Sequence, residues 1–299
     1  MKILVSGSTG LVGSALVPRL KAQGHEVLRL VRSTPQAGAG EVYWNPEQGT
    51  LKAEEIEGVD AVVHLAGESL AEGRWTEEKK KKIRESRVKG TTLISETLAR
   101  LERKPQVLVS ASAVGFYGSR GDETLNEQSA SGEDFLAEVC RAWELSTQAA
   151  AQSGVRVVNL RFGVILSSEG GALAKMLTPY KMGVGGKLGN GEQYMSWIAL
   201  DDAVGAILHA LENDTLRGPV NVVAPHPATN YDFTKTLGHV LSRPTIFPLP
   251  AFAARLMFGE MADATLLASQ RVEPARLKES GFAFKYPELE GALRHVLDK

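Results

Sequence analysis

Residues 2–32 decide the fold, and they read KILVSGSTGLVGSALVPRLKAQGHEVLRLVR. The apolar run Ile3-Leu4-Val5 is typical of a short strand that is buried on both faces. A glycine-rich stretch, Gly7–Gly13, follows directly, and Ser14–Gln23 then has the apolar spacing of a helix. Val27–Val31 is expected to be a second strand. Strand, glycine-rich turn, helix and strand in this order predict the opening of a parallel α/β sheet.

The alternation of strands and helices continues along the chain. Further strands are expected at Glu41–Trp44, Ala61–Leu65, Val107–Ser110, Val155–Leu160 and Val220–Val223, with helices at Thr76–Leu101 and Asp134–Gln152. This order predicts a parallel sheet with right-handed crossovers. We therefore expect an α/β fold, a Rossmann-type doubly wound parallel sheet with a smaller C-terminal α+β substrate domain. The first unit would comprise residues 1–165 plus about 196–224, and the second about 166–195 and 225–299.

Composition narrows the class of protein. The 299 residues are 43% hydrophobic and 23% charged, which is ordinary globular usage, and the net charge of −1 argues against a nucleic-acid partner. The single cysteine excludes an internal disulfide and fits a reducing compartment. No apolar run is long enough for a membrane helix, and no secretory signal precedes the first strand. The six scattered histidines predict no metal site. A cytoplasmic protein is expected, with a homodimer left open.

The glycine-rich stretch has the spacing of a dinucleotide-binding turn. Gly7 would form the tight turn, Gly10 would let the backbone approach a pyrophosphate, and Gly13 would let the helix pack on the strand. The helix N-terminus, with Thr9 and the adjoining Leu11 and Val12, would offer free N–H groups to the phosphates. The alternative is an ordinary strand-to-helix turn.

The end of the second strand indicates which dinucleotide is bound. An acidic residue at this point accepts a hydrogen bond from the ribose 2′-OH of NAD, whereas an arginine accommodates the 2′-phosphate of NADP. This chain has Val31-Arg32-Ser33, so we expect Arg32 to hold the phosphate and the cofactor to be NADP(H). The alternative is an arginine that is merely exposed.

Several motifs beyond the glycine-rich stretch recur together in one known family. They are Leu65-Ala66-Gly67-Glu68, Arg74-Trp75-Thr76, Ser86-Arg87, Ser110-Ala111-Ser112, Phe116-Tyr117-Gly118, Trp143-Glu144, Leu160–Ile165, Gly183–Gln193, Ser196-Trp197-Ile198, and Pro248–Pro274 with Gly281-Phe282. Together they resemble the extended short-chain dehydrogenases/reductases. The resemblance is to the atypical sugar-nucleotide epimerase-like branch (NAD-dependent epimerase/dehydratase) with a C-terminal domain of unknown function. One departure is Ala199, where relatives commonly have histidine.

The resemblance implies further cofactor contacts. The Leu65-Ala66-Gly67 segment, Ser110 and Ile165 would line the cofactor, and Arg87 and Lys82 would reach it from the long helix. The charged run that contains Lys82, Glu77–Lys82, is either a phosphate-binding patch or a solvated helix face.

The standard catalytic pair of the extended family is missing. That pair is Tyr-x-x-x-Lys, which moves a proton and holds the cofactor ribose. Counting back from Glu144 places Leu136 and Cys140 at its positions, and a slip of one residue gives Phe135 and Val139. The Tyr-x-x-x-Lys that does occur, Tyr231 and Lys235, lies in the C-terminal unit and is expected to be structural.

Three other residues could supply the chemistry. Ser112 could orient a substrate or simply form a turn, and Tyr117 could donate a proton or form a pocket wall. Glu68 could be a general acid or base if its pKa is raised, or could cap the next helix. For substrate contacts we expect Lys187, Asn190, Gln193 and Trp197, and the alternative is a plain flexible loop.

Two functions are compatible with these residues. The first is an NADP-dependent oxidoreductase or epimerase-like enzyme acting on a small polar, nucleotide-sugar-like substrate. The second is a catalytically inactive NADPH-binding sensor or scaffold protein, which the missing pair favours. Fold-level analogy does not decide between them.

Overall fold

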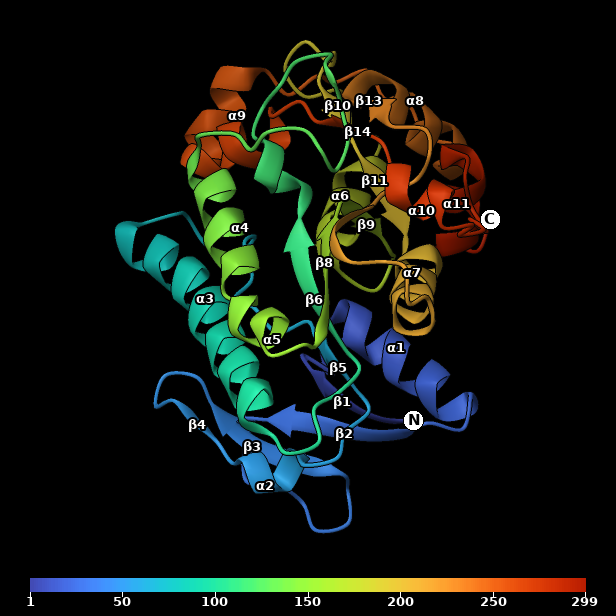
Figure 1. Ribbon diagram of the computed structural model, residues 1–299. Helices are drawn as coiled ribbons and strands as arrows, with labels where there is room; N and C mark the ends of the chain where they lie inside the picture. The colour runs from blue at the N-terminus through green and yellow to red at the C-terminus, as the bar shows by residue number, and fades with distance from the viewer.

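A sheet of eight strands forms the centre of the computed structural model, which describes residues 1–299 (Figure 1). Its strands are β1 (Lys2–Ser6), β2 (Glu26–Val31), β3 (Glu41–Asn45), β4 (Thr50–Leu51), β5 (Ala61–His64), β6 (Val107–Ala113), β8 (Arg156–Phe162) and β12 (Gly218–Val222). Their order is β12-β8-β6-β5-β1-β2-β3-β4, and every pair is parallel except the antiparallel β3–β4. The order reverses between β1 and β5, which is where open α/β sheets bind ligands. The expected Rossmann-type sheet is confirmed.

Helices cover both faces of this sheet (Figure 1). They are α1 (Leu11–Ala22), α2 (Ala53–Ile56), α3 (Glu77–Arg100), α4 (Phe135–Leu145), α5 (Gln148–Gln152), α6 (Gly171–Lys181), α7 (Leu200–Glu212), α8 (Asn230–Leu241), α9 (Ala251–Phe258), α10 (Ala275–Glu279) and α11 (Leu289–Val296). A 3-10 turn (Val114–Tyr117) and a π turn (Ala262–Leu266) complete the set. Helix α3 contacts α4 and α5 on one face, and α1 contacts α7 on the other.

Strand β1 shows why the sheet needs both layers. Ile3 and Val5 belong to one apolar cluster, which includes Leu16 of α1 and Ile207 of α7. Leu4, on the opposite face of the strand, belongs to a second cluster that contains residues of α3. All three strand side chains are fully buried. Successive residues of a strand point to opposite faces, so an unbroken apolar run requires cover on both sides.

The C-terminal unit lies beyond the carboxyl end of β6, at the top of Figure 1. Short strands tie it together: β7 (Thr124–Leu125) with β14 (Arg271–Val272), β9 (Val164–Leu166) with β11 (Trp197–Ala199), and β10 (Tyr194–Met195) with β13 (Ala228–Thr229). The unit thus stands over the sheet edge where parallel strands place their ligand-binding turns. None of the chain's helices combines the length and the apolar character needed to cross a bilayer.

One predicted helix is divided in two. The sequence indicated a single helix over 134–152, but α4 ends at Leu145 and α5 begins at Gln148. The hydroxyls of Ser146 and Thr147 donate to the carbonyls of Ala142 and Glu144 at 2.7 Å each. Such local side-chain bonds compete with the helical ladder and interrupt it.

Candidate functional site

The glycine turn between β1 and α1 leaves almost no room for side chains. Gly7 has φ +69°, and a Cβ there would lie 2.8 Å from the Ala66 nitrogen. A Cβ on Gly13 would lie 2.2 Å from the Gly7 carbonyl oxygen, so this glycine lets α1 pack on the turn. A Cβ on Gly10 would meet only the Gly7 oxygen, at 3.4 Å, because that side of the turn is open. The three positions therefore have the geometry expected of a dinucleotide-binding turn.

The N-terminus of α1 is free to bind an anion. Gly10 precedes the helix and provides no side-chain cap, and the first turn contains no acidic residue. The first helical bond joins the Ser14 nitrogen to the Gly10 oxygen at 2.8 Å, so the amides of Leu11, Val12 and Gly13 have no partner within the protein. Free amides and the helix dipole together favour phosphate at this point.

A buried polar network holds the end of β5 against the glycine turn. The Ser6 hydroxyl accepts from the backbone nitrogens of Leu65 and Ala66, at 3.2 and 3.4 Å. It lies 2.6 Å from Nδ1 of His64, whose Nε2 lies 3.0 Å from the Thr91 hydroxyl. Since the Ser6 oxygen already accepts twice, its proton goes to Nδ1, and His64 donates from Nε2 to Thr91. The network fixes the Leu65-Ala66 segment that was expected to line a cofactor.

Because His64 is buried, we expect the protein to lose stability in mild acid. Burial lowers the pKa of His64 from 6.5 to about 4. The unfolded chain therefore binds this proton more readily, so stability is complete above pH 6.5 and is lost as the pH falls toward 4. Between neutral pH and about pH 5 the free energy of unfolding should decrease by about 2 kcal/mol from this group. Urea titrations across this range measure it, and His64→Asn should lack this part of the slope; an unchanged slope would contradict the assignment.

Arg32 and Glu68 lie at strand ends on either side of the glycine turn. Arg32 follows β2 and is exposed, and Val31 before it is partly buried. Glu68 follows β5, and its Oε1 lies 2.7 Å from Nζ of Lys79 on α3. The hydrogen bond from Lys79 lowers the pKa of Glu68, and the charges of Lys79, Lys82 and Arg32 lower it further. This is opposite to the direction that an acid–base role would need at neutral pH.

Arg87 carries a charge that the protein itself leaves largely unpaired. Its guanidinium donates to the Ile83 carbonyl at 3.0 Å and lies 5.1 Å from the centre of the Trp143 ring. Burial lowers its pKa, and a Cβ on Gly67 would be only 3.5 Å from the guanidinium carbon. Arg87 thus borders the β5 turn and can donate to an anion there. Lys82 instead points outward, paired with Glu78 at 2.8 Å.

Ile165 and Ser110 were also expected to line the cofactor. A Cβ on Gly171 would lie 3.3 Å from the Leu11 side chain and 3.7 Å from the Ile165 carbonyl oxygen. This places β9 and the start of α6 over the beginning of α1. Ser110 is fully buried on β6 beside His64 of β5, and its hydroxyl makes one long bond of 3.5 Å to the Ala111 carbonyl.

The residues proposed for proton transfer form an internal network instead. Ser112 donates to Oε1 of Glu144 at 2.7 Å, and Arg161 binds both oxygens of that carboxylate at 2.7 and 2.8 Å. Arg161 also donates to the Tyr117 hydroxyl at 3.0 Å, which donates to Oδ1 of Asn221 at 2.7 Å. Tyr117 is fully buried, and burial raises its pKa. Its hydroxyl is buried and is bonded to Arg161 and Asn221 inside the protein.

Helix α4 offers no replacement for the missing pair. Leu136 and Cys140 are both buried, and a Cβ on Gly115 would lie 3.4 and 3.9 Å from their side chains. Burial raises the pKa of Cys140 to about 12, so the thiol stays protonated. In the other register, Phe135 packs edge-on against Trp75 and Val139 is buried. Neither register places a tyrosine or a lysine here.

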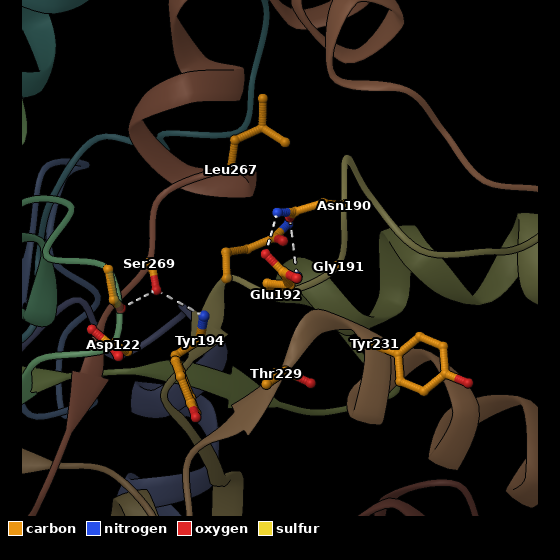
Figure 2. Close-up of a pocket in the computed structure, with 11 residues that line it drawn as sticks. Asp122, Asn190, Gly191, Glu192, Tyr194, Thr229, Tyr231, Leu267 and Ser269 are labelled. Carbon is orange, nitrogen blue, oxygen red and sulfur yellow. Dashed lines mark hydrogen bonds between the residues drawn. The ribbon is translucent and has the colours of Figure 1, made fainter.

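The predicted substrate residues separate into two groups. Asn190 and Gln193 line an open cavity of about 760 Å³, which Figure 2 shows with Asp122, Tyr194 and Tyr231 around it. Lys187 lies just behind it and donates to the Asn190 carbonyl at 3.0 Å. No residue of the glycine turn lines this cavity.

Trp197 requires a correction to the sequence-based expectation. It was expected to form a pocket wall, but its side chain is fully buried in the C-terminal core, and its Nε1 donates to the His226 carbonyl at 3.0 Å.

The Tyr-x-x-x-Lys pair of the C-terminal unit, Tyr231 and Lys235, lies on α8. Nζ of Lys235 lies 5.5 Å from the centre of the Tyr231 ring.

Some residues that shape the site could not be found from the sequence motifs. The polar network is one such group: Ser6 and His64 end apolar strands, and Thr91 lies within a helix, and all three are buried. A polar residue at an otherwise apolar position is the only local sign in the sequence of such a network. Lys79 lies within the charged run but is largely buried, with 13% of its side chain exposed, because Glu68 reaches it from another element.

The fold and the turn together define a nucleotide-binding α/β protein with a Rossmann-type sheet. Residues 3–224 match the model of the NAD dependent epimerase/dehydratase family, and residues 249–296 match a domain of unknown function, DUF1731. The chain belongs to the NAD dependent epimerase/dehydratase family.

Proteins from several organisms match nearly the whole of this chain. An epimerase family protein of Mycobacterium bovis is 43% identical over 98% of this chain and 97% of its own. The crystal structure of human epimerase family protein SDR39U1 with NADPH superimposes with a TM-score of 0.91, at 32% identity and full coverage of both chains. A nucleoside-diphosphate sugar epimerase from Corynebacterium glutamicum gives a TM-score of 0.83 at 40% identity, over 99% of this chain and 58% of that one.

Proposed function

We propose that this protein binds NADP(H) at the glycine turn and transfers hydride to or from a small polar, nucleotide-sugar-like substrate. The observation that carries the proposal is the uncapped N-terminus of α1 behind a turn of three glycines. A Cβ on Gly7 or Gly13 would clash with backbone atoms, and one on Gly10 would enter the open side of the turn. Arg32 beside this turn favours a 2′-phosphate. The NADPH in the human relative's structure and the sugar-nucleotide name of the bacterial one are in line with it.

The residues around the turn fit a dinucleotide. The amides of Leu11, Val12 and Gly13 would bind the pyrophosphate, and the Leu65-Ala66 backbone and Ile165 would border the cofactor. Arg87 would donate to it from α3. A bound NADPH supplies the hydride. We assign cofactor binding to residues 1–165 plus about 196–224, and substrate binding to about 166–195 and 225–299.

A second function is favoured by one specific observation. Leu136 and Cys140 occupy the positions of the usual proton-transfer pair, and the hydroxyls of Ser112 and Tyr117 are engaged internally. A protein that binds NADPH without turnover, as a sensor or scaffold, would need no proton donor. Purified protein loaded with NADPH and supplied with pools of carbonyl compounds and nucleotide sugars separates the two. Cofactor oxidation supports the enzyme, whereas tight binding without turnover supports the sensor.

Replacing Arg32 by alanine should weaken NADPH binding by about 10- to 100-fold, because charge-assisted hydrogen bonds to a phosphate are lost. NADH, which lacks the 2′-phosphate, should bind the variant as it binds the parent. Fluorescence titration of both nucleotides measures the two dissociation constants. The control is Arg100→Ala, which removes an exposed arginine at the C-terminal end of α3 and should change neither dissociation constant. Equal NADPH affinity in Arg32→Ala and the parent protein would refute the assignment of NADP(H) to this turn.

A further inference from the structure

The loop that joins β5 to α3 borders the proposed cofactor site on the side opposite α1. We call residues 65–76 the rim loop, and they contain neither helix nor strand. Its first residues, Leu65-Ala66, are fixed by the buried polar network at the end of β5. Trp75 anchors its far end, because this side chain is only 8% exposed and its Nε1 donates to the Leu70 carbonyl at 2.9 Å. Residues 71–74, between these anchors, are exposed.

The beginning of α6 touches both sides of the proposed cofactor site. A Cβ on Gly171 would lie 3.3 Å from the side chain of Leu11, at the start of α1. Four residues later, Nζ of Lys175 donates to the Ala71 carbonyl of the rim loop at 2.6 Å. Four residues of helix rise by about 6 Å. The first turn of α6 therefore spans from the glycine turn to the rim loop, at the edge of the sheet where α/β proteins bind their ligands.

Two further contacts hold the rim loop and the start of α3 against the segment that contains α9. Arg74 donates to the Leu256 carbonyl, and Nζ of Lys80 lies 3.1 Å from Oε1 of Glu260. Figure 1 shows α9 near the upper ends of α3 and α4. Together with the bond from Lys175, these contacts tie the C-terminal unit to the rim of the proposed site, and we call the three contacts the latch.

The latch is built to open without disturbing a packed core. Lys175 and Arg74 are exposed, and polar contacts between exposed side chains are individually weak. Gly73 has φ +72°, and no atom lies within 4 Å of the position of its Cβ. Residues 71–74 can therefore move away while Trp75 stays buried. A short exposed loop with a glycine beside a ligand site is a common form of lid.

We propose that residues 71–74 are a gate on the cofactor site, held shut by the latch, and that nucleotide enters and leaves only when the latch opens. The inference rests on the proposed binding of NADP(H). All three latch contacts join protein groups to one another, and none involves the glycine turn. The latch therefore has the same strength with or without nucleotide. It should set the rates of association and dissociation and leave the affinity unchanged.

Weakening the latch at two places tests the gate. Lys175→Met should raise the association and dissociation rate constants of NADPH by about threefold each, with less than about a twofold change in Kd. Adding Glu260→Gln should bring both increases to about tenfold. Stopped-flow fluorescence of NADPH measures the rates. Trypsin should also cleave after Arg74 faster in both variants, because the open loop is the form that a protease can bind.

The matched control is Lys181→Met, the same change at an exposed lysine in the last turn of α6, which should alter neither rate. A faster dissociation alone in Lys175→Met would mean that Lys175 holds the nucleotide itself, and would overturn the gate. Unchanged rates in a protein that binds NADPH would overturn the gate alone. A parent protein that binds neither NADPH nor NADH would overturn the proposed function as well.

Discussion

Replacing Gly13 by alanine should lower the free energy of unfolding by about 3 kcal/mol and abolish nucleotide binding. The added Cβ would lie 2.2 Å from the Gly7 oxygen and 2.7 Å from the Ser8 Cα. Both are backbone atoms, so no side chain can rotate away, and α1 has to move off the turn. The uncapped helix N-terminus moves with it, and the amides that we propose to bind phosphate lose their positions. Urea unfolding followed by circular dichroism and NADPH titration measure the two losses.

Gly10→Ala is the matched control in the same turn. Its Cβ would meet only the Gly7 oxygen at 3.4 Å, and Gly10 has φ −78°, which alanine adopts readily. Stability should change by less than about 1 kcal/mol. NADPH binding should still fall by at least about tenfold, because the methyl group points into the space through which a pyrophosphate approaches. A Gly10 variant as unstable as the Gly13 variant would show that close packing at Gly13 is not the cause.

Replacing Arg161 by methionine should cost about 3–5 kcal/mol of stability. The change removes both bonds to Glu144, whose side chain is 13% exposed, and one bond to Tyr117. Glu144 then remains buried as an uncompensated charge. Thermal and urea unfolding measure the loss.

Two comparisons isolate the charge effect at Arg161. Arg161→Met combined with Glu144→Gln should be more stable than Arg161→Met alone, since the unpaired charge is gone. Arg120→Met breaks a more exposed pair with Glu123 and should cost less than about 1 kcal/mol. A double variant no more stable than the single one would mean that lost packing against Phe116 determines the cost, since the guanidinium lies 3.4 Å from that ring centre.

Features that depend on neighbours in the sequence could be predicted. The glycine turn, the order of strands and helices, and the limits of α3 all follow from local signals. Thr76 accepts from the Lys79 nitrogen at the start of α3, and Glu77 and Glu78 occupy its first turn, as a helix N-terminus favours. These preferences act over three or four residues, so they can be read from the chain directly.

The candidate chemistry depends on distant residues, and there the sequence was insufficient. Tyr117 lies at a strand end, as a pocket residue would, but its partner Asn221 is 104 positions away. Trp197 belongs to the core because α6, α8 and α11 surround it, which no local pattern shows. The sequence allows Glu68 to be an acid, a base or a helix cap, and only the contact with Lys79, 2.7 Å away, shows that its pKa is lowered. Long-range contacts decide whether a polar side chain faces ligand or protein.

The position of β12 has a consequence for the order in which the chain acquires its structure. This strand pairs with β8, yet 55 residues, 163–217, separate the two in the chain. During synthesis β8 is therefore an open edge strand until residue 222 has emerged, and Val158 and Leu160 also wait for the cover of α7. Open apolar edges pair with other chains. The Rossmann-type sheet cannot close before residues 166–195, the first segment of the C-terminal unit, have been made, whereas α8 to α11 are made after its last strand.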